Sequence, residues 1–548
     1  MTATILLIQP PIEDFYLTKK RTIPYGLISI AAQLCEAGFS VNLLDALATT
    51  KSRVIGLPKE MDYLQEFYGT EDQSPCALFH HYRHYGYAFQ HIAKLVRESA
   101  PFLVGISSLF SPYANTALKT AEIVKKELPE CTVVMGGHHP TAMPEYVMAC
   151  NAVDFVLRGD GEASLPLLAQ ALVNKGKHIE NIPGIVYRQP DGALHISPPD
   201  TIRNLDDLAV PAARLLNFHY YQRQGNASYV IVASRGCPFQ CSYCSMGNSG
   251  TAFRKRSVKS VLQEMTTAVD TFNAKFIDFE DENISLDRTW FMKLLHAVIN
   301  RFGPSSLELR AMNGLYPPSL DTRIVSRMKD AGFRVLNLSL GTTSKAQLKR
   351  FNRPDLVSAF EHALALAELL RMEAVGYIIV GAPHQDPFES VDDLLYFAQQ
   401  RVLAGVSVFY PAPGSHDYSL CRDQGILPGT PSLFRSSALP VSHKTSRKDA
   451  VTLLRLARVL NFMKAIIDQG LRLPKPLPFD AQRIKDCSST FEIGNMLLQW
   501  FLHDGNIRGI TKAGRVYEHS VSTALTHRFI QGLQRLKIRG INKGPEKG

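Results

Sequence analysis

The sequence predicts an α/β protein with a doubly wound parallel-sheet domain, then a partial barrel of parallel strands, and finally a mostly helical carboxyl-terminal region. Three observations lead to this prediction. Short apolar strands alternate with helices over residues 1–175, the alternation resumes in longer units over 228–425, and helical spacing dominates 426–548. Strands that alternate with helices of this length form parallel sheets joined by right-handed crossovers.

The first 175 residues hold five apolar runs of strand length, and Gly38 ends the first helix between them, since glycine is favoured just beyond a helix. The predicted strands are 5–8, 41–44, 102–107, 132–135 and 155–157, the predicted helices are 24–37, 86–99, 114–127 and 163–174, and residues 50–85 are irregular. Ligands of such sheets bind beyond the carboxyl ends of the strands. The polar turns at those ends are 107–108 (SS), 136–141 (GGHHPT) and 159–162 (GDGE).

Residues 176–227 are predicted to form a connector with a hairpin at 184–196, because Asp191-Gly192 is a strong hairpin turn signal. Six strand–helix repeats follow and predict a parallel barrel, complete or partial. Its predicted strands are 229–233, 276–279, 307–311, 335–340, 377–380 and 406–410, and its helices are 257–271, 288–302, 320–331, 357–371 and 389–403. In the carboxyl-terminal region we expect helices at 447–469 and 490–503.

The composition excludes several classes of protein. The chain has 548 residues, of which 45% are apolar and 20% are charged, so it is not mainly disordered, collagen-like or coiled-coil. No run reaches 18 apolar residues, which argues against a membrane-spanning helix. The first ten residues lack the basic segment and cleavage site of a signal peptide, so we expect a cytoplasmic protein.

The net charge of +10 is concentrated near the end of the chain, where residues 505–548 hold nine Lys or Arg and two Glu. The remainder is nearly balanced, which does not favour a nucleic-acid enzyme. In this basic tail, Leu525, Phe529, Leu533 and Leu536 share one face of a predicted helix. Such a helix either packs on the protein, which we favour, or lies on an anionic membrane surface.

The nine cysteines are an odd number and too few for a disulfide scaffold. Three of them, Cys237, Cys241 and Cys244, follow the first barrel strand with the spacing C-x3-C-x2-C. Structural zinc usually needs a second cysteine pair, which is missing, whereas three thiolates suit an iron–sulfur cluster with one open iron. The alternative, three neighbouring core cysteines, is disfavoured because Gly236 and Pro238 indicate a loop.

This motif, with an aromatic residue before its last cysteine, resembles that of the radical S-adenosylmethionine (SAM) enzymes over residues 228–425. The resemblance implies a (βα)6 partial TIM barrel, a 4Fe–4S cluster on Cys237, Cys241 and Cys244, and SAM that is cleaved reductively to a 5′-deoxyadenosyl radical. Positions similar to the family's SAM-binding segments are Tyr243, Asp281, Glu282, Ser339, Gly341, Gly376 and Gly381. The sequence departs from the family at Thr342, where an acidic residue is common. An acidic helix entry and a plain buried strand remain the alternatives for 281–285 and 376–383.

The amino-terminal domain resembles the Rossmann-like cobalamin-binding domain of the B12-dependent radical SAM enzymes. By this resemblance the cobalamin contacts are Ser107, Ser108, Gly136, Gly137, His138, Thr141, Gly159, Gly161 and Glu162. Many cobalamin proteins carry Asp-x-His-x-x-Gly after the first strand, but residues 10–17 (PPIEDFYL) hold no histidine, so we expect no cobalt ligand from this loop. The alternative is a domain that binds no cofactor or binds part of the substrate. The HHYRH run at 80–84 is expected to be a solvated insertion and not a metal site.

Together these resemblances imply a B12-dependent radical SAM enzyme that uses a 4Fe–4S cluster, SAM and cobalamin, and they favour a methyltransferase acting on an unactivated carbon. No catalytic side chain can be named from the sequence. Two alternatives remain: a cyclase or rearrangement enzyme with the same cofactors, and a non-catalytic iron–sulfur or corrinoid carrier. The expected partners are a small-molecule or lipid-like substrate and an electron donor such as flavodoxin or ferredoxin, with no nucleic acid.

Overall fold

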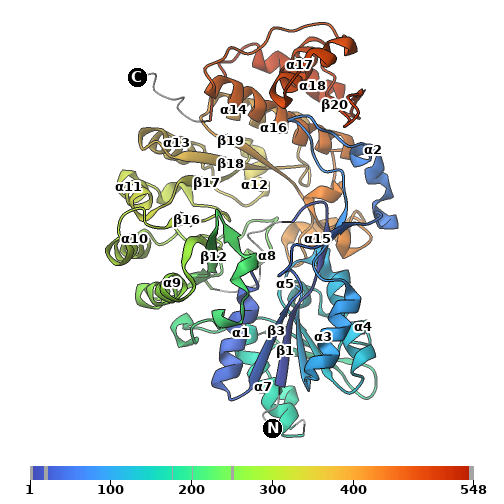
Figure 1. Ribbon diagram of the computed structural model, residues 1–548, viewed down its shortest axis with the longest axis vertical. Helices are drawn as coiled ribbons and strands as arrows, with labels where there is room; N and C mark the ends of the chain where they lie inside the picture. The colour runs from blue at the N-terminus through green and yellow to red at the C-terminus, as the bar shows by residue number, and fades with distance from the viewer. Residues whose placement is uncertain (1–3, 18–22, 176, 200, 249–251, 542–548) are drawn as a thin grey trace.

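The computed structural model describes residues 4–17, 23–175, 177–199, 201–248 and 252–541. The amino-terminal domain lies at one end of an elongated molecule, the barrel is in the middle, and the carboxyl-terminal helices lie at the other end (Figure 1). The last residues of the basic tail, 542–548, and residue 176 at the start of the predicted connector are outside the described residues.

The amino-terminal sheet is doubly wound, as predicted, with its parallel strands in the order β3–β1–β6–β7–β8. These strands are β1 (Thr4–Gln9), β3 (Ser40–Asp45), β6 (Leu103–Ser107), β7 (Thr132–Gly136) and β8 (Phe155–Leu157). Two apolar clusters cover the two faces of the sheet. One includes residues of α1 (Tyr25–Glu36) and α7 (Gly161–Val173), and the other includes residues of α3 (Phe89–Ser99) and α4 (Ala114–Glu127).

The predicted hairpin forms, but it belongs to this sheet and not to a separate connector. Strands β9 (Ile185–Arg188) and β10 (Leu194–Ile196) extend the sheet beyond β8, and β9 pairs antiparallel with β8. The sheet therefore has seven strands where the sequence predicted five. Val186 is fully buried in β9, so covering the open edge of β8 also adds to the core.

Six parallel strands form the predicted partial barrel. They are β12 (Asn226–Ile231), β15 (Ala274–Phe279), β16 (Glu308–Arg310), β17 (Val335–Gly341), β18 (Glu373–Val380) and β19 (Leu403–Val408). The strands pair as β12–β15–β16 and as β17–β18–β19, and isolated bridges join Leu309 to Phe333 and Leu315 to Leu338. Within the described residues no pairing joins β19 back to β12, so the barrel stays open on one side.

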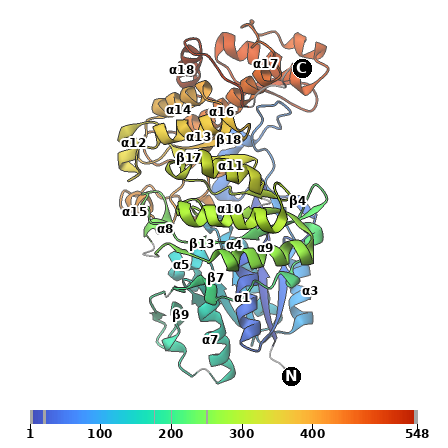
Figure 2. The ribbon, with the colours of Figure 1, turned by 90° about the vertical axis from the view of Figure 1, so that its left-hand side faces the viewer.

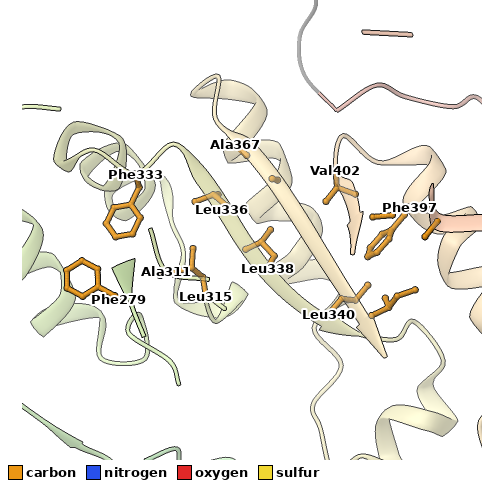
Figure 3. Close-up of a cluster of buried hydrophobic side chains, with 14 of the residues drawn as sticks. Phe279, Ala311, Leu315, Phe333, Leu336, Leu338, Leu340, Ala367, Phe397 and Val402 are labelled. Atoms are coloured by element: carbon orange, nitrogen blue, oxygen red, sulfur yellow. The ribbon is translucent and has the colours of Figure 1, made fainter. Parts of the chain in front are cut away.

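Helices cover the outside of the barrel. They are α9 (Val258–Phe272), α10 (Arg288–Phe302), α11 (Thr322–Ala331), α13 (Val357–Leu369) and α14 (Pro387–Gln399), and Figure 2 shows the first three stacked between the two ends of the molecule. Leu336, Leu338 and Leu340 of β17 are fully buried and lie with Ala367 and Phe397 of the covering helices in one apolar cluster (Figure 3). Since strand residues alternate in direction, the residues between these leucines face the barrel interior.

Residues 55–82, which we call the strap, leave the amino-terminal domain and run beside the barrel to the carboxyl-terminal helices, where α2 (Gln65–Tyr68) lies (Figure 1). The strap is tied at its far end by the Asp72 carboxylate, which accepts hydrogen bonds from the Ile510 backbone at 3.2 Å and from Ser74 at 2.8 Å. His519 Nε2 lies 3.0 Å from the same carboxylate. The irregular stretch of the prediction is therefore an ordered link between distant parts of the chain.

The end of the strap and the strand that follows it are buried, so the prediction of a solvated insertion at residues 80–84 is wrong for Tyr82 and His84. Tyr82 and His84 are only 5% and 1% exposed. Both ring nitrogens of His84 are used, because Nδ1 lies 3.0 Å from the Glu13 carboxylate and Nε2 lies 3.0 Å from the Tyr87 carbonyl. The segment is buried because β5 (Arg83–Tyr85) pairs with β2 (Ile12–Asp14) and with β4 (Ser52–Val54).

The carboxyl-terminal region contains α16 (Arg447–Asp468), α17 (Thr490–Asp504), the hairpin β20 (Arg508–Ile510) and β21 (Val516–Glu518), and α18 (Thr523–Leu533). In α18, Leu525, Phe529 and Leu533 are buried, and the helix packs against α14 and α16. The interpretation of this face as a membrane-binding surface is therefore wrong, because the protein core already covers it. Within the described residues, no helix has the length and apolar character needed to cross a membrane.

We predict that Phe529→Ala lowers the free energy of unfolding by about 3–5 kcal/mol, because it removes a fully buried ring from the core. The matched control is Gln531→Ala, since Gln531 is exposed on the same helix. Denaturant unfolding measures both changes. Equal stability of the two variants, together with loss of binding to anionic vesicles in Phe529→Ala alone, would restore the membrane interpretation.

Candidate functional site

The cysteine loop lies at the carboxyl end of β12, between β13 (Ser234–Arg235) and α8 (Ser245–Asn248). Cys241 is buried, and Cys237 and Cys244 are half-buried. The loop backbone is fixed from both sides, because the Ser242 N–H donates to the Phe351 carbonyl at 2.9 Å and the Ser242 hydroxyl donates to Asp417 at 2.9 Å. The three thiols therefore come from a loop whose conformation the barrel determines.

The three cysteines fit an iron–sulfur cluster better than a single metal ion. No group of three or more His, Cys, Asp or Glu in the described part of the chain is close enough to hold one ion. A cubane instead binds each thiolate at a different iron, so its ligands stay farther apart. The pKa of the Cys237 thiol is raised by burial and further by the neighbouring Cys244 and Cys241. Positively charged iron among the three sulfurs would offset both effects.

Arg353 is a site residue that the sequence analysis missed. Its guanidinium donates to the Tyr243 hydroxyl at 3.0 Å and to the Ser339 carbonyl at 2.7 Å, and it lies 4.0 Å from the Cys241 sulfur. Its buried Nε has no hydrogen-bond partner in the described structure. The cation therefore lies where it can stabilise thiolate and cluster charge. An isolated arginine after a short helix belongs to no motif, so the sequence carries no signal for it.

The two acidic residues after β15, Asp281 and Glu282, differ in their surroundings. The Asp281 carboxylate accepts hydrogen bonds from the Ser234 hydroxyl at 2.5 Å and from the Ala233 N–H at 3.2 Å, and burial raises its pKa to about 6. Its oxygens thus hold the strand that leads into the cysteine loop, and the expected contact of Asp281 with SAM stays a prediction. Glu282 is half-buried, and burial raises its pKa to about 7 although the N–H of Gly236 lowers it. Of the two acids, Glu282 is the one available to a ligand ammonium.

The segment after β17 also lies beside the cysteines. Gly341 has φ of +86°, and the Arg353 side chain is 3.5 Å from the position of a Cβ there. Ser339 holds the same arginine through its carbonyl and its hydroxyl. Thr342 is fully buried and donates to Asp393 at 2.8 Å, so it faces the core at the position where the family often has an acid.

In the β18 segment, the surrounding structure accounts for glycine at both Gly376 and Gly381. A Cβ on Gly376 would lie 2.8 Å from Phe397 and 2.9 Å from Phe360, so close packing of the covering helices requires glycine there. The structure thus explains this residue without the approach of an adenine ring. Gly381 has φ of +75°, and its carbonyl accepts a hydrogen bond from the Ser442 hydroxyl at 2.6 Å.

In the amino-terminal domain, Ser107 and Gly136 end two adjacent parallel strands, and the turns after them meet. Gly137 has φ of +117°, and a Cβ there would lie 2.6 Å from the Ser108 carbonyl oxygen, so glycine is required. The Ser108 hydroxyl is buried without a hydrogen-bond partner among the described residues. An unpaired polar atom at a strand end fits a ligand with amide groups, such as a corrinoid.

The two histidines after Gly137 lie in different surroundings. His138 begins α5 (His138–Ala142) and is exposed to solvent. His139 is 1% exposed, has Nδ1 3.1 Å from the Ser111 hydroxyl, and has its pKa lowered by burial to about 4. His139 Nε2 is buried without a hydrogen-bond partner among the described residues, as the Ser108 hydroxyl is, so both histidines remain candidates for a ligand contact.

The loop after β1 holds no histidine, and its two acidic residues, Glu13 and Asp14, both have partners within the protein. Asp14 is buried and accepts from the Tyr113 hydroxyl at 2.7 Å, and Arg435 lies 3.3 Å from the same carboxylate. The expectation that this loop supplies no histidine to cobalt stays a prediction. His84, which contacts Glu13 of the loop, has both of its ring nitrogens within 3.0 Å of protein oxygen atoms.

The turn after β8 joins the two domains. Arg235, two residues before Cys237, lies 2.9 Å from Asp160 and 2.5 Å from Glu162, and Arg254 lies 2.8 Å from Asp160. Burial raises the pKa of Asp160, but the two arginines outweigh this effect and lower it. We call these four side chains the interdomain lock.

The interdomain lock gives Glu162 a structural role in addition to the cobalamin contact expected of it. Glu162 is 7% exposed and also accepts from the Ser29 hydroxyl at 2.7 Å, so its carboxylate holds both Arg235 and Ser29, and its expected contact with cobalamin stays a prediction. Gly161 allows close packing, because a Cβ would lie 2.9 Å from Ile30. The Gly159 N–H donates to the Thr141 hydroxyl at 3.2 Å, which connects this turn to the turn after β7.

Comparison with known sequences matches two parts of the chain. Residues 78–169 match the family described as B12 binding domain, and residues 231–396 match the Radical SAM superfamily. An uncharacterized methyltransferase of Pyrococcus horikoshii is 28% identical, with 61% of this chain and 73% of the relative covered. The cytidylyl-2-hydroxyethylphosphonate methyltransferase of Streptomyces wedmorensis is 26% identical, with 79% and 84% covered.

A third relative has a different activity. The anaerobic magnesium-protoporphyrin IX monomethyl ester cyclase of Cereibacter sphaeroides is 26% identical, and the match covers 61% of this chain and 55% of the cyclase. Among solved structures, the radical SAM methyltransferase TsrM from Kitasatospora setae shares the fold with a TM-score of 0.62 and 16% identity, over 83% of this chain and 89% of TsrM.

The two domain matches fall on the doubly wound domain and on the barrel that carries the three cysteines. The shared fold extends over both domains and beyond them. The chain therefore carries a B12-binding domain followed by a radical SAM domain, the combination of domains found in the cobalamin-dependent radical SAM enzymes.

Proposed function

We propose that the protein is a methyltransferase that moves a methyl group from SAM, by way of cobalamin, to an unactivated carbon of a small-molecule substrate. The observation that carries this proposal is the interdomain lock, which joins the turn after β8 to the residue two positions before Cys237. It holds the ligand-facing ends of both domains together. The names of two of the relatives, both methyltransferases, support the same reaction class.

The chain contributes binding and orientation to this reaction. When bound, the cluster and SAM supply a radical that removes a substrate hydrogen atom, and cobalamin carries the methyl group. Around them, α5 of the first domain and α8 of the cysteine loop approach the loop that contains Gly414, where a Cβ would lie 3.8 Å from Ala142 and 3.7 Å from Ser245. Such positioning converts separate encounters into reaction within one bound assembly.

We also propose that a reduced flavodoxin or ferredoxin supplies the electron, as the resemblance implies. Lys345 and Lys349 are exposed on α12 (Lys345–Arg350), and the helix is followed by Asn352, whose side chain donates to the Gln240 carbonyl of the cysteine loop at 3.0 Å. Exposed lysines near the cluster loop favour an acidic electron donor, because complementary charge steers association.

The competing function is a cyclase or rearrangement enzyme, which the cyclase relative favours. The amounts of the two SAM products distinguish the reactions. A methyltransferase of this kind forms S-adenosylhomocysteine when the methyl group leaves SAM and 5′-deoxyadenosine when SAM is cleaved, whereas a cyclase without methylation forms only 5′-deoxyadenosine.

We predict that reduced holoenzyme with SAM forms both products and that, without substrate, S-adenosylhomocysteine stops at about one equivalent per bound corrinoid. Chromatography with mass detection measures both. Formation of 5′-deoxyadenosine alone would favour the cyclase, and formation of neither product would favour the non-catalytic carrier.

The three cysteines should carry the cluster. We expect the triple change of Cys237, Cys241 and Cys244 to Ala to abolish bound iron, bound sulfide and 5′-deoxyadenosine formation, because iron–sulfur clusters are held by thiolates. Cys487→Ala, in the carboxyl-terminal region, is the matched control and should retain all three. A triple variant that still cleaves SAM would refute this assignment.

The two acids after β15 should behave differently. Glu282→Gln should weaken SAM binding by about 10-fold or more while the cluster content remains, because a charge-assisted hydrogen bond to the SAM ammonium is lost. Asp281→Asn should mainly reduce cluster content, since it loosens the strand before the cysteine loop. Equilibrium binding of SAM and iron analysis separate the two effects, and the reverse pattern would show that Asp281 is the SAM ligand.

A further inference from the structure

A cavity of about 510 Å³ lies inside the barrel, at the amino-terminal ends of β16 to β19. This is the opposite end of the strands from the cysteine loop, so the cavity is not the cofactor site described above. Its volume falls in the range of small-molecule binding sites. The expected cofactor contacts do not line it, and nothing else in the fold fills it.

The wall of the cavity is mostly apolar and comes from three parts of the chain. The barrel contributes aliphatic strand residues and Tyr377, α16 contributes Leu454 and Ala457, and the strap contributes Leu78 and Phe79. The strap residues follow Asp72, which ties this segment to the carboxyl-terminal region. The apolar wall is therefore assembled from distant segments, each held in place by contacts outside the cavity.

The charged residues of the lining carry an excess of positive charge. Arg223 pairs with Glu308 at 2.7 Å and Arg310 pairs with Asp278 at 2.6 Å. Arg334 and Arg458 also line the cavity and are exposed, and neither has an acidic partner in the described part of the chain. Two uncompensated guanidinium groups beside an apolar wall suit a carboxylate or a phosphate, which arginine binds through paired hydrogen bonds.

The interior face of β17 leads from the cavity to the cysteine loop. Val335 and Asn337 line the cavity, and Ser339 follows on the same face of the strand, before the pairing register shifts between Ser339 and Gly341. Ser339 binds Arg353, which lies beside Cys241. The strand spans roughly 20 Å from Val335 to Gly341 at about 3.3 Å per residue. An extended ligand held at the cavity rim would therefore point toward the cluster.

We propose that this cavity binds an amphiphilic anion, with its apolar body inside the barrel and its carboxylate or phosphate on Arg334 and Arg458. The inference rests on the proposed function in one respect, namely that this ligand is the methyl acceptor. In that case the carbon that reacts belongs to the apolar part of the molecule, remote from the anionic group.

Binding to the holoenzyme tests the site with four probes of equal chain length: dodecanoate, dodecyl phosphate, dodecanol and dodecyltrimethylammonium. Isothermal titration should give the tightest binding for one of the two anions, and the tighter of them identifies the head group. The alcohol should bind at least 10-fold more weakly and the cation weaker still. Equal affinity for all four probes, or no binding of either anion, would overturn the proposal.

Variants locate the anion site. Arg334→Gln with Arg458→Gln should weaken the preferred anion by at least 10-fold and leave dodecanol binding unchanged, whereas the control Arg327→Gln, on the exposed face of α11, should change neither. A double variant that binds the anion as tightly as the control would overturn the assignment.

The same samples are assayed for 5′-deoxyadenosine. Wild-type protein that binds the anion but forms none refutes the proposed function alone, and protein that cleaves SAM but binds no anion refutes this inference alone.

Discussion

The ion pairs of Arg235 with Asp160 and Glu162 are the interaction on which the arrangement of the two domains depends. The arginine lies on the cysteine loop side and both acids lie on the turn after β8. All three side chains are largely buried, so breaking the pair by removing one partner would leave an uncompensated charge, which costs about 3–5 kcal/mol. The lock thus resists separation of the domains and brings the turns of the first domain to the carboxyl end of the barrel.

The same lock explains why the sequence analysis located the site better than it assigned the roles within it. The strand–helix alternation and the C-x3-C-x2-C spacing are local patterns, and the barrel strands, the covering helices and the cysteine loop follow them closely. Glu162 and Asp281 were expected to touch cofactors because acids in polar turns are common ligands. Their hydrogen-bond partners, Arg235 and Ser234, come from other segments, and such pairings cannot be read from local spacing.

Other differences have the same origin. The strap looked irregular because its order comes from contacts such as Asp72 with the Ile510 backbone, more than 400 residues away. Arg353 had no motif, yet it lies 4.0 Å from the Cys241 sulfur because α12 returns the chain to the cysteine loop. The tail helix was ambiguous because an apolar face at helical spacing suits a membrane or a core equally. Only the packing of Phe529 against the rest of the chain decides between them.

In this account the barrel has two functional ends. The cofactor end lies at the carboxyl termini of its strands, where the interdomain lock acts, and the proposed anion-binding cavity lies at their amino termini. Magnetic interaction between cob(II)alamin and the reduced cluster, measured by pulsed electron paramagnetic resonance, tests the central claim most directly. The account predicts a resolved interaction in the wild-type protein that is lost or weakened in Arg235→Gln, with both cofactors still bound. Wild-type protein that contains both cofactors and gives no interaction, or an Arg235→Gln variant with an unchanged interaction, would contradict it.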